Sequence, residues 1–513
     1  MSPRKGSKGG KGSRKRSAPT EQPETPQPTE PTELHALLAD AAAPRPSGRP
    51  RPPGQRLYDM PYSAVAPRLV NPALGLHNLV ARAGHNAAYT IDVTLLDAPD
   101  HRLIRSGVLL AHRVLDGRGE WFLTAPDWQP LLPKDRIELM GHSDLPEELA
   151  DLIRPLRRRA PLGPVAAMSC DRREFALRDD AGTTLALLRD DRVTVRRGGL
   201  TTARYREVMI TPVGPGLTEE QGAWLDRALT GVGSTLVQRF PRLVSRLGAP
   251  ATGPTDIPQL VDVDREASFK KFFGQLVGRR LRQLVEADLA VRGGDLAAGE
   301  VLADQARRMA TELEGLGVAV EAEWLSDLAD ELAWLVAEDP EPTERLASRL
   351  RSERYVALLD LLVTAARSPR LGDRGTVPAA EELDRLLQVA LDQLSAVVEG
   401  ADVDSPAASW EQVRRSLRRV EAVVALASPV LTDVAGEVER RLRKPRSRID
   451  ALCEEPLEED AALASVGSAD PITAFAAGRA WERRVAEVRQ ARQAFLDDWR
   501  RAARKLERVR SAQ

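Results

Sequence analysis

Two arginines in the C-terminal half of the chain have the type and the spacing to bind phosphate groups. Arg414 and Arg418 are four residues apart in the segment WEQVRRSLRRVEA, which has helical periodicity. Residues at this spacing share one face of a helix, so the two side chains could contact adjacent phosphates of a linear polyanion. Each guanidinium is a planar fork that can donate two hydrogen bonds to one phosphate group. The sequence therefore offers a candidate anion-binding face.

Carboxylates that could bind a metal ion are scarce in the N-terminal half. No glutamate occurs between Glu33 and Glu120, and Met209 and Thr211 occupy the alternate positions that follow Glu207. A strand that holds Mg²⁺ or Mn²⁺ for phosphate chemistry offers carboxylates at alternate positions, because these share one face. We therefore expect no cluster of three or more inward carboxylates around Glu207 and very slow metal-dependent phosphoryl transfer.

Signatures of other enzyme classes do not occur. The chain has no P-loop, no G-x-S-x-G segment and no paired CxxC, and its six histidines follow no metal-ligand spacing. The two cysteines, Cys170 and Cys453, lie in different halves and predict no disulfide framework. A reducing cytoplasm fits this cysteine usage.

Composition limits the number of domains and the kinds of function that the chain could have. A chain of 513 residues is too long for one core, so two or three domains are expected. The net charge of −1 argues against a general nucleic-acid binder, and sequence-specific nucleic-acid binding is not expected. No apolar run of about 18 residues predicts a membrane span, and the basic N-terminus lacks the apolar segment of a secretion signal.

The sequence divides into four regions. Residues 1–55 form a basic, then acidic and proline-rich tail that should be disordered. Residues 56–248 contain short alternating runs typical of strands, with helices expected at about 145–158 and 218–230. Residues 249–264 are expected to form a linker. Residues 265–510 show helical periodicity and predict an all-α bundle, including a helix of 30 or more residues near 474–508.

Several segments of the β half carry a family resemblance: LLDAPDHRLIRSGVLLAHR (Leu95–Arg113), LPEELADLIRPLRRRAPLGPVAAM (Leu145–Met168), LALLRDDRV and YREVMITPV. They resemble the CYTH domain, the triphosphate-tunnel fold of adenylate cyclase-like and thiamine-triphosphatase-like enzymes. The resemblance implies an antiparallel β barrel or open tunnel. Of the family's metal-binding carboxylates, only Glu207 remains, and Leu187 stands where another is usual.

The same resemblance implies cationic positions inside the tunnel. Arg113 and Arg172 correspond to inward basic residues of the family, and Arg242 replaces a lysine of its closing helix. Arg206 has no such match, and by strand alternation it should face away from its sequence neighbours. These arginines are candidates for binding a phosphate chain. The competing interpretation is a set of arginines exposed on the strands.

The helical half carries a second resemblance. VRGGDLAAGEVLADQARRMATEL (291–313) and WEQVRRSLRRVEA (410–422) resemble the two signature motifs of CHAD, the conserved-histidine α-helical domain that binds polyphosphate. The resemblance implies phosphate-binding roles for Arg307, Arg308, Arg414, Arg415 and Arg418. Glu300 and Glu411 occupy the two histidine positions. The competing interpretation is a helix surface of internal ion pairs, Glu411 with Arg415 and Asp304 with Arg307 or Arg308.

Three hypotheses follow. The first is a non-catalytic CYTH–CHAD protein, degenerate in both signature sites, that binds inorganic polyphosphate, another polyanion or a protein partner, with no catalytic residue and no cofactor. The second is a metal-dependent inorganic triphosphatase with a diverged Mg²⁺ or Mn²⁺ site. The third is a purely structural helical scaffold. The altered signature positions favour the first.

Overall fold

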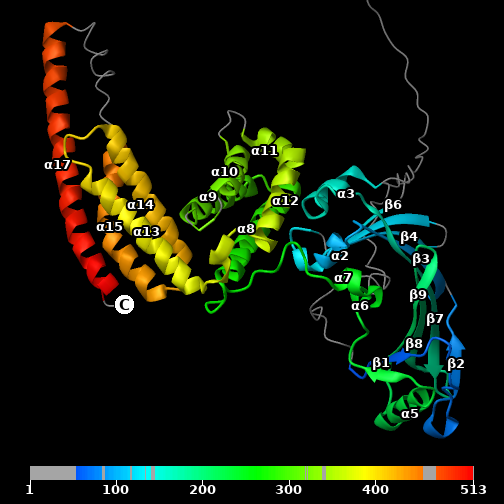
Figure 1. Ribbon diagram of the computed structural model, residues 1–513. Coiled ribbons are helices and arrows are strands. Elements are labelled where there is room, and N and C mark those ends of the chain that lie inside the picture. The colour runs from blue at the N-terminus through cyan, green and yellow to red at the C-terminus, as the bar shows by residue number, and fades with distance from the viewer. Residues whose placement is uncertain are drawn as a thin grey trace, which may run out of the picture.

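A computed structural model shows an antiparallel sheet followed by a long series of helices (Figure 1). It describes residues 53–83, 87–115, 118–132, 135–139, 145–317, 319–320, 322–337, 342–454 and 470–511. The predicted fold class, an antiparallel β region followed by an all-α region, is confirmed. The basic and proline-rich tail lies outside the described residues.

The sheet contains ten strands among the described residues, all paired antiparallel. They are β1 (Arg56–Met60), β2 (Asn78–Ala81), β3 (Ala88–Asp97), β4 (Leu109–Leu115), β5 (Arg118–Thr124), β6 (Asp135–Leu139), β7 (Gly163–Arg178), β8 (Thr184–Arg197), β9 (Leu200–Pro212) and β10 (Thr235–Val237). Their order is β10-β1-β9-β8-β7-β3-β4-β5-β6, and β2 pairs with β7. Within the described residues the ends β10 and β6 do not pair, so the sheet is open and not a closed barrel.

Strand alternation divides the sheet residues between two faces. On β9, Tyr205 packs into the core on one face and Val208 into the core on the other. The first face is covered by the short helices α6 (Leu243–Leu247) and α7 (Ala249–Thr252), and the second by α5 (Glu219–Thr230). The predicted helix at 218–230 is confirmed, and Thr218 and Gln221 form a capping box at its start.

The face covered by α6 and α7 is partly filled by apolar side chains. Leu243 and Leu247 of α6 and Ala251 of α7 pack in one cluster with strand residues such as Phe122 and Val193. Burying these side chains stabilises the sheet by roughly 1.5–3 kcal/mol for each large residue. This part of the sheet face is therefore a packed apolar core.

The helical region consists mainly of long helices. Its described helices are α8 (Phe269–Arg292), α9 (Ala298–Gly315), α10 (Ala322–Leu335), α11 (Pro342–Arg351), α12 (Glu353–Arg367), α13 (Ala379–Glu399), α14 (Ala407–Ala427), α15 (Thr432–Glu454) and α17 (Pro471–Ser511). The predicted long helix near 474–508 is confirmed as α17, whose 41 residues span about 60 Å at 1.5 Å per residue. None of the described helices is long and apolar enough to cross a membrane.

The sheet and the first helices share one apolar core. Trp121 and Trp128 from the β half cluster with Phe269 and Leu281 of α8, and the guanidinium of Arg282 lies 4.3 Å from the Trp128 ring centroid. The expected helix at 145–158 packs here but is broken into α3 (Glu147–Leu152) and α4 (Arg154–Arg157). Pro155 is the cause, since proline is tolerated in the first turn of a helix and breaks a helix interior.

Candidate anion-binding site

The sheet arginines that could bind phosphate are buried and already paired. Arg113 donates from Nε to Glu120 Oε2 at 2.7 Å. Arg172 donates two hydrogen bonds to Asp191, at 2.7 and 2.9 Å, and a third to the Tyr89 hydroxyl at 2.9 Å. Both arginine side chains are 3% exposed or less. A phosphate chain would have to displace Asp191 from Arg172, whereas Arg113 keeps a buried Nη1 group with no hydrogen-bond partner among the described residues.

The other two sheet-region arginines lie elsewhere. Arg206 points to the opposite face, as strand alternation predicted, and forms a two-point pair with Asp190 at 2.6 and 2.7 Å. Arg242 is exposed at the N-cap of α6 and forms no ion pair with the residues that the structure describes. The four arginines therefore do not converge on one site.

Three carboxylates form a row across adjacent strands, which corrects the expectation from the sequence. Glu207 on β9 lies directly opposite Asp59 on β1 and Asp191 on β8, so the three share one face. The prediction that no cluster of three or more carboxylates surrounds Glu207 is wrong. Register explains the error: Asp59 and Asp191 are far from Glu207 in sequence, and alternation within one strand does not reveal them.

Arginines occupy this carboxylate row. Arg246 of α6 lies 3.4 Å from Asp59 and 3.5 Å from Glu207, and its guanidinium lies 4.3 Å from the Tyr205 ring centroid. Asp191 is shared between Arg172 and Arg189. Among the described residues no group of three or more His, Cys, Asp or Glu side chains is arranged to hold a metal ion. As placed, these carboxylates fit guanidinium groups and not Mg²⁺ or Mn²⁺, which require several oxygens around one point.

The protonation of Glu207 gives a testable pH dependence. Burial, reinforced by the nearby carboxylates Asp191 and Asp59, raises the pKa of Glu207 from 4.5 to about 7, and Arg246 opposes this shift. The folded state therefore binds this proton more tightly than the unfolded chain. The contribution of Glu207 to the free energy of unfolding should fall as pH rises from about 4.5 to about 7, and level off above that.

Replacing Glu207 by glutamine should remove this dependence. Relative to the parent chain, Glu207→Gln should gain stability as pH rises from about 4.5 to about 7, by at most about 1.4 kcal/mol for each pH unit, and the gain should level off above that. Urea unfolding at several pH values measures the effect, and Glu482→Gln on the exposed face of α17 is the control. Parallel stability curves for the parent and Glu207→Gln would contradict the prediction.

A cavity of about 340 Å³ between α14 and α15 contains the best-placed cations of the helical region. It is lined by Arg414, Arg418 and Glu421 of α14 and by Arg446 and Asp450 of α15. Arg414 and Arg418 therefore share one face, as their spacing predicted. Arg446 adds a third guanidinium that the sequence analysis missed, although the basic run RRLRKPRSR (440–448) was a visible signal.

The charges around this cavity are only partly paired. Arg414 bonds to Glu411 at 2.8 Å, and this hydrogen bond lowers the pKa of Glu411. Arg446 lies 3.2 Å from Glu421 and 3.8 Å from Asp450. Arg418 is exposed and forms no ion pair with any described residue. The site thus has one uncommitted guanidinium and two whose carboxylate partners an anion could displace.

The remaining candidate arginines are not part of this cavity. Arg307 and Arg308 are exposed on α9, where Arg307 pairs with Asp304 at 2.7 Å. Arg415 is exposed on α14. The prediction that Glu411 pairs with Arg415 is wrong, because Glu411 pairs with Arg414 instead. The prediction that Asp304 pairs with Arg307 or Arg308 is confirmed. The structure therefore brings Arg414 and Arg418 to one cavity, whose lining does not include the α9 arginines.

The segment DAPDHRL, which carried part of the family resemblance, has a structural role. The Asp97 carboxylate is fully buried and accepts hydrogen bonds from the backbone N–H groups of Ala98, Leu103 and Ile104 at 2.6 to 3.0 Å. These bonds hold the turn that connects β3 to the short helix α2 (Arg102–Arg105). Burial raises the Asp97 pKa to about 6, and the three backbone donors oppose the shift. Asp97 shapes the end of the sheet and is not available to a ligand.

No family model matches the chain. Two proteins of Mycobacterium tuberculosis, the uncharacterized proteins MT2285 (strain CDC 1551 / Oshkosh) and Rv2226 (strain H37Rv), are each 25% identical to it over 343 residues. The match covers 62% of this chain and 62% of each relative, which is less than two thirds of their length.

Among solved structures, PptA from Streptomyces chartreusis is 18% identical, with a TM-score of 0.30, over 46% of this chain and 100% of that one. A proposed adenylate cyclase from Bacillus halodurans is 14% identical, with a TM-score of 0.21, over 34% of this chain and 98% of that one. The fold described above rests on the strand pairing itself.

Proposed function

We propose that this chain is a non-catalytic protein of the CYTH–CHAD type that binds inorganic polyphosphate or a similar phosphate-rich anion through its helical half. The observation that supports this most directly is the cavity between α14 and α15, where Arg414, Arg418 and Arg446 converge. The sheet arginines Arg113 and Arg172 are buried and each is paired with a carboxylate, so we do not assign them to this site.

The charge balance predicts weak, salt-sensitive binding. Glu411, Glu421 and Asp450 compete with an anion for the three guanidinium groups. Retention of a polyanion by arginine releases counterions, so affinity falls steeply with salt. Three phosphate contacts would reduce affinity roughly 20- to 40-fold between 50 and 200 mM salt, on the slope known for nucleic acids. The ligand is thus a long polyanion that makes several contacts and not a single phosphate.

Removing the two arginines of α14 that line this cavity should abolish most of the polyphosphate binding. We expect Arg414→Ala with Arg418→Ala to lower polyphosphate affinity at least about tenfold, a loss of about 1.4 kcal/mol. Binding is measured by fluorescence anisotropy with labelled polyphosphate across a salt series. Arg500→Ala with Arg504→Ala, the same spacing on the exposed face of α17, is the matched control. Conversely, Glu411→His should raise affinity a few-fold, because the carboxylate that pairs with Arg414 is removed.

The outcomes of this experiment separate the binding hypothesis from the structural scaffold. Tight, salt-insensitive binding that neither arginine pair affects would contradict the α14–α15 site. No binding at low salt would favour the structural scaffold.

The triphosphatase alternative is favoured by one observation, the row of Asp59, Glu207 and Asp191. We expect tripolyphosphate hydrolysis with Mg²⁺ or Mn²⁺ to remain at background, because Arg172, Arg189 and Arg246 occupy these carboxylates. Metal-dependent turnover that disappears in Glu207→Ala would establish the alternative.

A further inference from the structure

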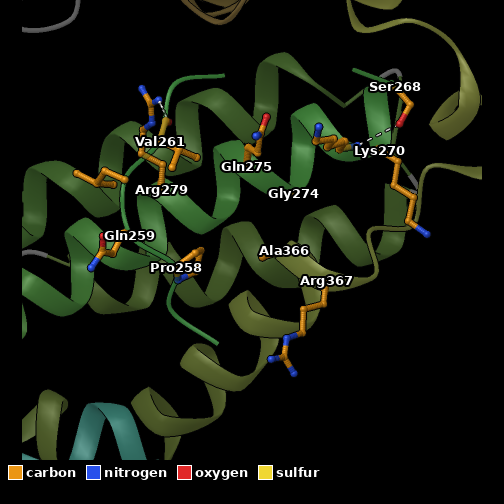
Figure 2. A pocket seen from close by; sticks show the side chains of 12 residues that line it. Pro258, Gln259, Val261, Ser268, Lys270, Gly274, Gln275, Arg279, Ala366 and Arg367 are labelled. Atoms are coloured by element: carbon orange, nitrogen blue, oxygen red, sulfur yellow. Dashed lines mark hydrogen bonds between the residues drawn. The ribbon is translucent and has the colours of Figure 1, made fainter. Parts of the chain in front are cut away.

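A second cavity, of about 400 Å³, has none of the candidate phosphate-binding arginines in its lining. It runs along the N-terminal half of α8, beside the segment 258–261 and the end of α12 (Figure 2). Its floor is formed where α8 and α12 approach closely: a Cβ atom at Gly274 would lie 2.6 Å from the carbonyl oxygen of Ala366. The absence of a side chain at Gly274 therefore lets α8 and α12 pack closely at the floor of the groove.

Cations surround the groove. Figure 2 shows Lys270 and Arg279 on α8 and Arg367 at the end of α12, at different sides of the groove. Lys270 is exposed and forms no ion pair with any described residue. Arg279 donates to the carbonyl oxygen of Val261 at 2.5 Å and has no carboxylate partner in the described part of the chain. Lys271 and Arg367 are paired with Asp264 and Asp256. The rim therefore carries a net positive charge.

One wall of the groove is an extended segment with apolar side chains. Leu260 and Val261 are 48% and 58% exposed. The backbone N–H groups of 259–263 donate no hydrogen bond to described residues. Exposed aliphatic side chains beside unpaired backbone groups and cations suit an extended, acidic peptide with some apolar residues, and not a bare phosphate.

The N-terminal part of this chain contains such a peptide. In TEQPETPQPTEPTELHALL (20–38), glutamates occur at positions 21, 24, 30 and 33, a spacing in multiples of three, and no Lys or Arg is present. Proline-rich sequences favour the polyproline II helix, which has three residues per turn and a rise of about 3.1 Å per residue. In that conformation the four glutamates lie on one edge. Leu34, Leu37 and Leu38 follow directly.

We propose that this acidic segment, residues 20–38 of the same chain, docks in the groove between the 258–261 segment and α8. Its glutamates pair with Lys270 and Arg279, and its leucines cover Leu260 and Val261. Glu33 precedes the first described residue, Pro53, by 20 residues, a tether that reaches up to about 66–72 Å when extended. Such a tether raises the effective concentration of the segment to the millimolar range, so individually weak contacts suffice.

Zero-length carbodiimide cross-linking of the full chain tests this docking, because it joins a lysine amine to a carboxylate only in direct contact. We expect cross-links from the glutamates of the segment to Lys270 and Lys271, identified by mass spectrometry. Lys444 and Lys505, exposed on α15 and α17, are internal controls and should react at least fivefold less. Substituting the four glutamates by glutamine should remove the links, and so should 1 M salt, which screens charge pairs.

A competition assay tests the same docking without cross-linking. The four-glutamine chain, with its groove empty, should bind a fluorescent peptide of residues 18–40 at least tenfold tighter than the parent chain. Adding Lys270→Ala and Arg279→Ala should abolish that binding, whereas Arg479→Ala with Arg483→Ala on α17 should not change it. Cross-links confined to the N-terminal lysines, equal yields at Lys444, links that form only between isotopically distinct copies, or a peptide that binds both chains equally would each overturn the proposal.

Discussion

Replacing Arg172 by methionine should lower the free energy of unfolding by about 3–5 kcal/mol, because it leaves Asp191 buried without its main partner. Asp191 is fully buried, and only Arg189, at 3.1 Å, would remain to balance its charge. The residue that the family resemblance assigns to phosphate binding therefore has its largest effect on stability. Urea unfolding followed by tryptophan fluorescence measures the loss.

The neighbouring residue on β7 supplies a matched control. Arg173 pairs with Asp171 at 3.3 Å, but both side chains are exposed. Arg173→Met should therefore lower the free energy of unfolding by less than about 1 kcal/mol. The double variant Arg172→Met with Asp191→Leu should recover most of the loss, since it removes both buried charges. An Arg172→Met chain of normal stability that binds polyphosphate more weakly would show that Arg172 is a ligand-binding residue.

Replacing Arg158 by methionine should lower the free energy of unfolding by about 2–4 kcal/mol. It should also weaken the connection between the two halves of the chain. Arg158 is buried and contacts Asp256, which precedes the helical region, and Asp360 of α12 at 2.6 Å. Asp256 keeps Arg367 as a second partner, and Asp360 is partly exposed, which limits the loss.

The two halves should then unfold less cooperatively in this variant. The parent chain shares one apolar core across the sheet and α8, so we expect a single urea transition by fluorescence and by circular dichroism. In Arg158→Met the transition followed by fluorescence and the transition followed by circular dichroism should occur at different urea concentrations. Arg159→Met is the control, because Arg159 is half-exposed and its contact with Glu353 is 3.4 Å. Coincident transitions in Arg158→Met would show that the apolar core alone couples the halves.

Both variants also bear on the proposed function. Neither arginine lines the α14–α15 cavity, so polyphosphate binding by the folded Arg172→Met and Arg158→Met chains should match that of the parent. A selective loss of binding in Arg172→Met would place the anion site at the sheet, and in Arg158→Met at the junction between the two halves of the chain.

The sequence by itself determined the local features of this protein. Residue alternation predicted the strands and the direction of Arg206, opposite to that of its sequence neighbours. Helical periodicity predicted α5, α17 and the common face of Arg414 and Arg418. These features follow from backbone geometry over a few residues, which repeats every two positions in a strand and every 3.6 in a helix. The lack of alternating glutamates around Glu207 was visible for the same reason.

The partners of each charged residue were decided only by the tertiary structure. Asp59, Glu207 and Asp191 form a row because β1, β9 and β8 pair in one particular register. Arg446 reaches the cavity of Arg414 and Arg418 because α15 packs against α14. Strand register and helix packing depend on the burial of the whole apolar core, which no short segment encodes. An arginine that its sequence motif marks as a phosphate ligand, such as Arg172, can therefore be a buried ion pair in the folded chain.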